Sequence, residues 1–200
     1  RHPGGAGALA FSPDGRYLVS GGENKVAWAV DLEQAERIAL RGHTDSVLAV
    51  TFSPTDEEIV VTTSRDGSAR VWNAETGELI KPLTRHAGFV ADAAFSPDGG
   101  LLVTAGEEED AHVWYTSDWS YFGALRGHAD QVRDVEFSPA GTLIATASFD
   151  GTARLWDAAR LDVVAELRGH TDWVAGISIG PAGARIELNE RWAEGMAMPA

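Results

Sequence analysis

Serine, histidine and aspartate recur in this sequence in the combination that hydrolases use for nucleophilic catalysis. The sequence holds two such triples, His43, Ser64, Asp66 and His128, Ser148, Asp150. A catalytic triple needs a single nucleophile that is exposed in a pocket beside an oxyanion hole. Here the triple is repeated, and each copy is followed by a tryptophan, Trp72 or Trp156. The repetition indicates a structural role, so we expect no catalytic residues and no enzyme activity.

The histidines are spaced along a lattice that also argues against a shared metal site. Five of the six stand nine residues before a hydrophobic residue, at His2, His43, His86, His128 and His170. The tripeptide Phe-Ser-Pro begins at four of those hydrophobic positions, Phe11, Phe52, Phe95 and Phe137. A period of this length is typical of repeat architectures, with one histidine in each repeat. Histidines in separate repeats are too dispersed to ligate one ion, so we expect no metal.

His112 lies outside the lattice. It occupies the position that Arg70 and Arg154 hold in the neighbouring repeats, and an acidic run precedes it, Glu107, Glu108, Glu109 and Asp110. Carboxylates in this number are able to form an oxygen-rich cation site. Charge runs more often form solvated turns, and the sequence favours that interpretation. We therefore expect no cofactor in this repeat or elsewhere.

Each repeat contains four short segments that are rich in β-branched and apolar residues and are separated by turn residues. In the repeat from Gly42 to Thr84 these segments are SVLAVTFS, EEIVVTTS, SARVWNA and ELIKPLT. The Asp66-Gly67 pair suits a tight hairpin, and no helical period persists anywhere in the chain. The fold class is therefore all-β, with four-stranded antiparallel blades that stack radially into a β-propeller. About four full blades and a partial fifth are expected, as an incomplete ring.

The repeated motifs resemble those of the WD-repeat (WD40) family. The motifs are Gly-His, Ser-x-Asp-Gly and Trp-Asp, the last at Trp156-Asp157. The resemblance implies a hydrogen-bonded tetrad in each intact blade, and the two tetrads are His43, Ser64, Asp66, Trp72 and His128, Ser148, Asp150, Trp156. In the third repeat Gly106 replaces the serine and Glu108 replaces the aspartate, so a weaker blade is expected there. In the first repeat Trp28 is out of register, and a deletion of one residue would place Val30 where the tryptophan is expected. A weaker, more mobile blade is expected there as well.

The domain organisation follows from the repeats. Repeats are expected within residues 1–183, near 2–41, 42–84, 85–126, 127–168 and a partial 169–183, with a divergent tail at 184–200. The tail lacks the motifs, and a frameshift near Trp192 would restore an Asp-Gly-x-x-x-Trp pattern. A divergent native tail explains the sequence equally well. The incomplete number of blades and the absence of an initial methionine favour a larger parent protein.

Composition narrows the possible partners. The chain carries a formal net charge of −14 and has no cysteine. The acidic balance argues against a nucleic-acid partner, and no apolar run is long enough for a membrane span. We expect a cytoplasmic, non-catalytic scaffold that binds one or more protein partners and is able to self-associate through open blade edges. The alternatives are a sensor or regulatory module of a larger signalling kinase or NTPase and, less favoured, a propeller hydrolase or lactonase.

A partner would bind where loop residues of several repeats meet. The loop after each lattice histidine and the turn that carries each aspartate should lie on one rim of the propeller. The candidate residues on this rim are Ser46, Arg65, Phe89, Glu107, Gln131, Phe149 and Trp173. The three aromatic residues are the most informative, because aromatic side chains are common interface anchors. Packing of these rings into neighbouring blades is the alternative explanation.

Overall fold

The computed structural model describes residues 5–180 and 186–189, and all of the regular elements in this part of the chain are β-strands. The strands form four four-stranded antiparallel sheets and one two-stranded sheet. The first sheet contains β1 (Ala6–Phe11), β2 (Tyr17–Gly22), β3 (Val26–Asp31) and β4 (Glu36–Arg41). The second contains β5 (Val47–Phe52), β6 (Ile59–Ser64), β7 (Ala69–Asn73) and β8 (Leu79–Leu83). The predicted all-β fold of four-stranded blades is confirmed.

The remaining sheets follow in chain order. The third contains β9 (Val90–Phe95), β10 (Leu101–Gly106), β11 (Ala111–Tyr115) and β12 (Tyr121–Leu125). The fourth contains β13 (Val132–Phe137), β14 (Leu143–Ser148), β15 (Ala153–Asp157) and β16 (Val163–Leu167). The two-stranded sheet pairs β17 (Gly176–Ile179) with β18 (Ile186–Asn189). Most of the tail proposed for 184–200, including the residues of the frameshift hypothesis, lies outside the described residues.

Within each four-stranded sheet the strands hydrogen-bond in chain order, so every blade is a simple meander. Tight turns make this possible. Gly67 and Gly151 have φ angles of 82° and 78° in the hairpins between the second and third strands of their blades. Glycine adopts these positive angles without a Cβ clash, which explains the Asp-Gly pair at each hairpin.

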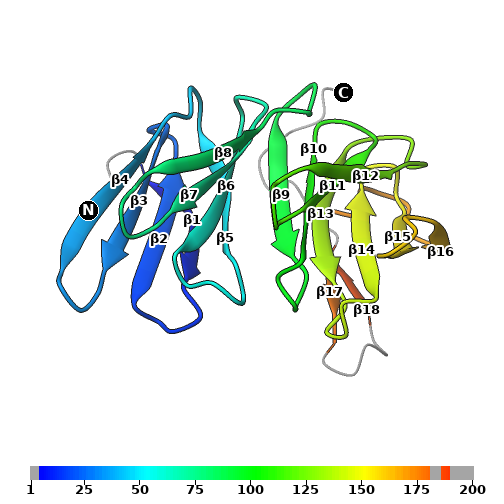
Figure 1. Ribbon diagram of the computed structural model, residues 1–200. Helices are drawn as coiled ribbons and strands as arrows, with labels where there is room; N and C mark the ends of the chain where they lie inside the picture. The colour runs from blue at the N-terminus through cyan, green and yellow to red at the C-terminus, as the bar shows by residue number, and fades with distance from the viewer. Residues whose placement is uncertain (1–4, 181–185, 190–200) are drawn as a thin grey trace, which may run out of the picture.

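The blades stack face to face in an open arc. The first strands of successive blades contact one another, β1 with β5, β5 with β9, β9 with β13 and β13 with β17 (Figure 1). Adjacent residues of one strand serve different interfaces, because side chains alternate across a sheet. Val60 packs in a cluster with Tyr17 of the first blade, whereas Val61 packs in a cluster with Leu102 of the third. Each inner blade therefore buries both faces, and the arc holds together as one core.

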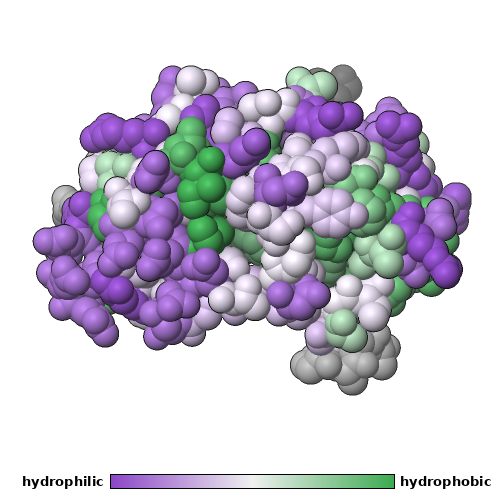
Figure 2. Space-filling model, in the orientation of Figure 1, coloured by the Kyte–Doolittle hydropathy of each residue, from purple (hydrophilic) through white to green (hydrophobic). Residues whose placement is uncertain are grey.

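The first blade leaves one face uncovered. Phe52 and Phe137 are 8% and 5% exposed, because each lies between two blades. The corresponding Phe11 is 62% exposed and Leu9, on the same strand, is 63% exposed. The surface seen in Figure 2 is otherwise mainly hydrophilic, with hydrophobic residues reaching it in a narrow band and in patches. No helix in the described residues is long and apolar enough to cross a membrane.

The uncovered face of β1 predicts self-association, since large exposed apolar patches favour contact with another surface. In sedimentation velocity at increasing concentration, the wild-type chain is expected to form larger species. The double substitution Leu9→Ser, Phe11→Ser should shift the chain toward monomer. The control Leu32→Ser removes another exposed leucine and should leave the distribution unchanged. Equal distributions for the wild type and the double variant would contradict the prediction.

Candidate functional site

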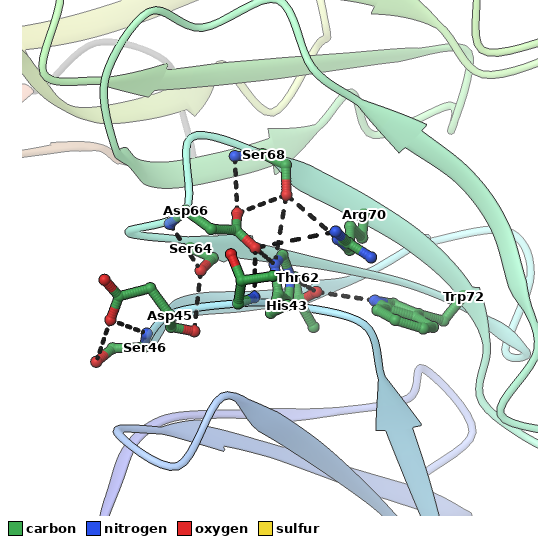
Figure 3. A network of polar contacts seen from close by, with 10 residues as sticks. His43, Asp45, Ser46, Thr62, Ser64, Asp66, Ser68, Arg70 and Trp72 are labelled. Atoms are coloured by element: carbon green, nitrogen blue, oxygen red, sulfur yellow. Dashed lines mark hydrogen bonds and ion pairs between the residues drawn. The ribbon is translucent and has the colours of Figure 1, made fainter.

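A continuous chain of hydrogen bonds runs through the second blade from a tryptophan to an aspartate (Figure 3). Trp72 Nε1–H donates to Thr62 Oγ1 at 2.8 Å, and His43 Nε2 lies 2.8 Å from the same hydroxyl. His43 Nδ1 lies 2.8 Å from Asp66 Oδ2. An indole only donates and a carboxylate only accepts, so the direction of the chain is fixed. Thr62 donates to His43 Nε2, and the neutral imidazole carries its proton on Nδ1.

The fourth blade contains the same chain. Trp156 Nε1–H donates to Thr146 Oγ1 at 2.9 Å, and His128 Nε2 is 2.7 Å from that oxygen. His128 Nδ1 then donates to Asp150 Oδ2 at 2.8 Å. Both threonines are fully buried. The histidine, aspartate and tryptophan of each predicted tetrad are thus brought together, with a threonine between histidine and tryptophan.

The prediction that Ser64 and Ser148 occupy that threonine position is wrong. Trp72 pairs with Val60 across the sheet, and Ser64 lies four residues further along β6, about 13 Å away. Ser64 Oγ instead donates to the backbone carbonyl of Asp45 at 3.1 Å and accepts the N–H of Asp66 at 3.1 Å.

Ser148 makes the equivalent pair of bonds, with the carbonyl of Asp130 and the N–H of Asp150. The serines therefore tie each hairpin turn to the loop after the histidine. The signal that was missed is a hydroxyl residue four positions before the turn acid in the second, third and fourth blades, at Thr62, Thr104 and Thr146.

The third blade retains the chain in altered form. Trp114 Nε1–H donates to Thr104 Oγ1 at 3.0 Å, and His86 Nε2 lies 2.8 Å from the same oxygen. The carboxylate comes from Glu108, whose Oε1 is 2.6 Å from His86 Nδ1. The expected loss of the hydroxyl in this blade is wrong, since Thr104 supplies it and Gly106 is not part of the chain.

In the first blade, Val30 pairs with Leu18 as Trp72 pairs with Val60. The predicted register is therefore confirmed. Trp28 instead occupies the register position of Arg70, opposite Ser20.

In the second and fourth blades the environment favours the ionised carboxylate and the neutral imidazole. Burial lowers the pKa of His43 and of His128, even though the adjacent aspartates act in the opposite direction. Burial alone would raise the pKa of Asp66. Hydrogen bonds from Ser68, the N–H of Thr44 and His43 outweigh burial and lower that pKa to about 2. An ionised acceptor facing a neutral donor keeps the hydrogen-bond directions unambiguous.

The glycines before His43 and His128 have a steric cause. Gly42 and Gly127 have φ angles of 156° and 141°, which residues with a Cβ rarely adopt. A Cβ on Gly42 would also collide with the guanidinium of Arg70, and one on Gly127 would collide with that of Arg154. In the third blade, Arg85 and the smaller His112 replace this glycine and arginine.

The seven predicted rim residues include three backbone-bonded pairs. The N–H of Arg65 donates to the carbonyl of Ser46 at 3.0 Å. The same bond joins Glu107 to Phe89 at 2.9 Å and Phe149 to Gln131 at 3.0 Å. Each bond connects the hairpin turn to the loop after the histidine of the same blade. The buried chain and the rim pair are therefore two layers of one loop–turn junction.

Aromatic side chains continue along this rim from blade to blade. The rings of Phe149 and Trp173 stack with centroids 4.5 Å apart at an interplanar angle of 13°. The guanidinium of Arg133 lies 4.9 Å from the Phe89 ring centroid and 5.1 Å from that of Phe149. Phe89 and Phe149 are half-buried, whereas Trp173 is 49% exposed. We call these four residues the rim ladder.

Hollows open on the rim within the described part of the chain. One of about 250 Å³ is lined by Phe149, Trp173 and the loop from His170. Another of about 640 Å³ lies between the first two blades and is lined by Ser46, Arg65 and residues of β1 and β5. Arg133 was not among the predicted rim residues, and its only signal in the sequence is its place near the start of β13, two residues after Gln131.

The repeated Ser-His-Asp triple does not present a nucleophile in either predicted copy. Ser64 and Ser148 are fully buried, and their hydroxyls donate to backbone carbonyls.

A further pair of polar residues was not predicted from the sequence. These are the carboxylates of Asp92 on β9 and Asp134 on β13. They accept the N–H groups of Val135 and Ile177 at 3.1 and 2.8 Å. Burial and the adjacent Asp134 carboxyl raise the pKa of Asp92 well above its usual value. These hydrogen bonds connect neighbouring blades, so the two carboxylates have a structural role.

Comparison with known proteins gives matches along most of the chain. A family model described as "WD domain, G-beta repeat" matches residues 1–28, 35–73, 77–115 and 119–157. An uncharacterized WD repeat-containing protein of Synechocystis is 36% identical over 91 residues, which cover 46% of this chain and 26% of that protein. Protein tipD of Dictyostelium discoideum is 39% identical over 89 residues, covering 44% and 14%. THO complex subunit 3 of Arabidopsis thaliana is 30% identical over 97 residues, covering 46% and 30%. The matched segment is thus less than a third of each relative.

Substitution of Thr146 is expected to lower the free energy of unfolding more than substitution of Ser148. Thr146→Val should lower the free energy of unfolding by about 2–4 kcal/mol, because Trp156 N–H and His128 Nε2 both lose a buried partner. Ser148→Ala should cost about 1 kcal/mol, because its partners lie at the loop–turn junction and Thr146 remains in place. Urea denaturation of both variants checks the order. An equal or larger cost for Ser148→Ala would contradict the threonine-centred chain.

Proposed function

The chain belongs to the WD-repeat family, and from that premise we propose that it acts as a non-catalytic scaffold that binds a protein partner through the rim ladder. The proposal is supported by the stacked pair Phe149 and Trp173 together with Arg133, which extends the contact to Phe89. Tryptophan and arginine are the side chains most enriched among interface anchors.

The rim ladder suits an interface for a second reason. Its side chains already contact one another, so a partner that binds there orders few additional rotamers. The exposed face of Trp173 and the adjacent hollow of about 250 Å³ offer a place for a side chain of the partner. The name of THO complex subunit 3, a relative over part of this chain, describes a component of an assembly. That name is consistent with a scaffold. That this chain also binds a protein partner is our proposal.

Affinity capture with matched variants tests the proposal. The wild-type chain, Trp173→Ala and Phe149→Ala would each be used as bait in extracts of the source cells, with quantitative mass spectrometry of the bound proteins. Tyr115→Ala is the matched control, because Tyr115 is a 41% exposed aromatic residue at the end of β11 toward the opposite rim.

We expect proteins that bind the wild type and the Tyr115→Ala variant to be depleted at least about tenfold with the two rim variants, which corresponds to a loss of about 1.4 kcal/mol. Circular dichroism would establish that all four baits are folded. If the same proteins bind all four folded baits equally, the rim ladder is not the binding site.

A further inference from the structure

The third blade departs from its neighbours at a set of positions that lie together in space. His112 pairs with Thr104 across β10 and β11, as Arg70 pairs with Thr62 and Arg154 with Thr146. Glu108 takes the place of the aspartate that bonds the lattice histidine. Tyr121 stands opposite Trp114, where the second and fourth blades have Leu79 and Val163. The replacements therefore introduce a second imidazole, a longer carboxylate and a phenol around His86.

These replacements form a compact cluster of two imidazoles and one carboxylate. His86 Nδ1 is 2.6 Å from Glu108 Oε1, and His112 Nε2 is 3.6 Å from the same oxygen. The two imidazole rings have centroids 4.6 Å apart. One donor atom from each of the three residues lies within 4.8 Å of the other two.

Neither imidazole nitrogen that faces Glu108 forms a well-aligned hydrogen bond, although both lie close to the carboxylate. In the second and fourth blades the corresponding nitrogens, His43 Nδ1 and His128 Nδ1, form well-aligned bonds of 2.8 Å to aspartate. His86 Nδ1 approaches Glu108 without hydrogen-bond geometry, and His112 Nε2 also has no hydrogen-bond partner. His112 is 6% exposed and the side chain of His86 is fully buried. Two buried nitrogens whose contacts with the carboxylate are poorly aligned need a physical explanation, because buried polar groups are normally satisfied by a well-placed partner.

We propose that His86 Nδ1, His112 Nε2 and the Glu108 carboxylate bind a zinc ion. Two histidines and one carboxylate form a common zinc ligand set, with water as the fourth ligand. Zinc bonds of about 2.0–2.2 Å in tetrahedral geometry place ligand atoms about 3.3 Å apart. The two distances from Glu108 Oε1 to the imidazole nitrogens, 2.6 and 3.6 Å, lie on either side of that value. A small rotation of the partly exposed Glu108 side chain therefore completes the site. The ion gives each unbonded nitrogen a partner for its lone pair.

The groups behind the two histidines fit this role. A nitrogen that binds metal leaves the proton on the other ring nitrogen, which then needs an acceptor. His86 Nε2 is 2.8 Å from Thr104 Oγ1, whose own hydroxyl is 3.4 Å from the carbonyl of His112 and donates to it. His112 Nδ1 is 3.4 Å from Tyr121 Oη. Thr104 and Tyr121 are therefore positioned to fix the ligating tautomer of each ring.

The ion would join three separate segments of the third blade. His86 precedes β9, Glu108 lies in the turn between β10 and β11, and His112 is part of β11. Phe89 and Glu107 of the rim are close neighbours of these ligands in sequence. Zinc would thus stabilise the loop–turn junction at one end of the rim ladder. This site departs from the expectation that the chain binds no metal, and it does not depend on the proposed partner interface.

Calorimetric titration of the tag-free chain with zinc chloride tests the site. His112→Phe removes one ligand and keeps a ring of similar size beside Arg85, so the fold should be retained. Glu108→Gln is a second variant that removes another ligand. Glu109→Gln is the matched control, with the same change of charge at an exposed position in the same turn.

The wild type and Glu109→Gln are expected to bind one zinc ion per chain with affinities that agree within about threefold. Because loss of a supporting group alone costs about 10–100-fold in affinity, His112→Phe and Glu108→Gln should each weaken binding by at least about 100-fold. Cobalt(II) in place of zinc should give the visible absorption of a tetrahedral site in the wild type and in Glu109→Gln, and should not give it in the two ligand variants. Absence of wild-type binding, equal binding by the ligand variants, or an equal loss with Glu109→Gln would each overturn the proposal.

Discussion

The structure depends most on one buried threonine hydroxyl in each of the three central blades. Thr62, Thr104 and Thr146 each accept an indole N–H and contact the lattice histidine of the same blade. The tryptophan lies on the third strand, the threonine on the second and the histidine on the loop that enters the first. The backbone hydrogen bonds of a meander connect only adjacent strands. The single threonine oxygen, in contrast, joins three segments of the blade. Because all three groups are buried, breaking this junction leaves polar atoms unsatisfied, which makes the junction more important than its few bonds suggest.

The surface properties follow from this buried junction. His43, His86 and His128 each fix the loop that precedes the first strand of their blade, and the acid that each one faces fixes the hairpin turn. Loop and turn then meet in a backbone bond such as that between Phe149 and Gln131. This arrangement places Phe149 where it stacks on Trp173 and contacts Arg133. The rim is thus a surface of side chains on a rigid base, and its composition can change from blade to blade while the buried chain is kept.

The sequence predicts the blades well because their signal is repeated and local. Apolar alternation, Asp-Gly turns and the period place the strands, and the histidine, acid and tryptophan of each chain follow from their register. The sequence is insufficient where the assignment of a residue depends on distance across the sheet. Ser64 looked equivalent to Thr62 as a hydroxyl residue, and only the pairing of Trp72 with Val60 places one within reach and the other about 13 Å away. The contacts of Arg133 and the contact of His112 with His86 join residues that are distant in sequence. A local sequence pattern therefore could not predict them.

The central claim is that the threonine-centred chain is present in three blades and is equally protected in each. Hydrogen exchange of the indole N–H protons, followed by NMR, tests this directly, because each bonded indole is open to solvent only when its blade opens. Trp72, Trp114 and Trp156 are predicted to exchange slowly and at similar rates, although the third blade uses Glu108 instead of aspartate. The indole of the exposed Trp173 should exchange fast. Rapid exchange at Trp114 alongside protection of the other two, or exchange of all three at the rate of Trp173, would contradict the account.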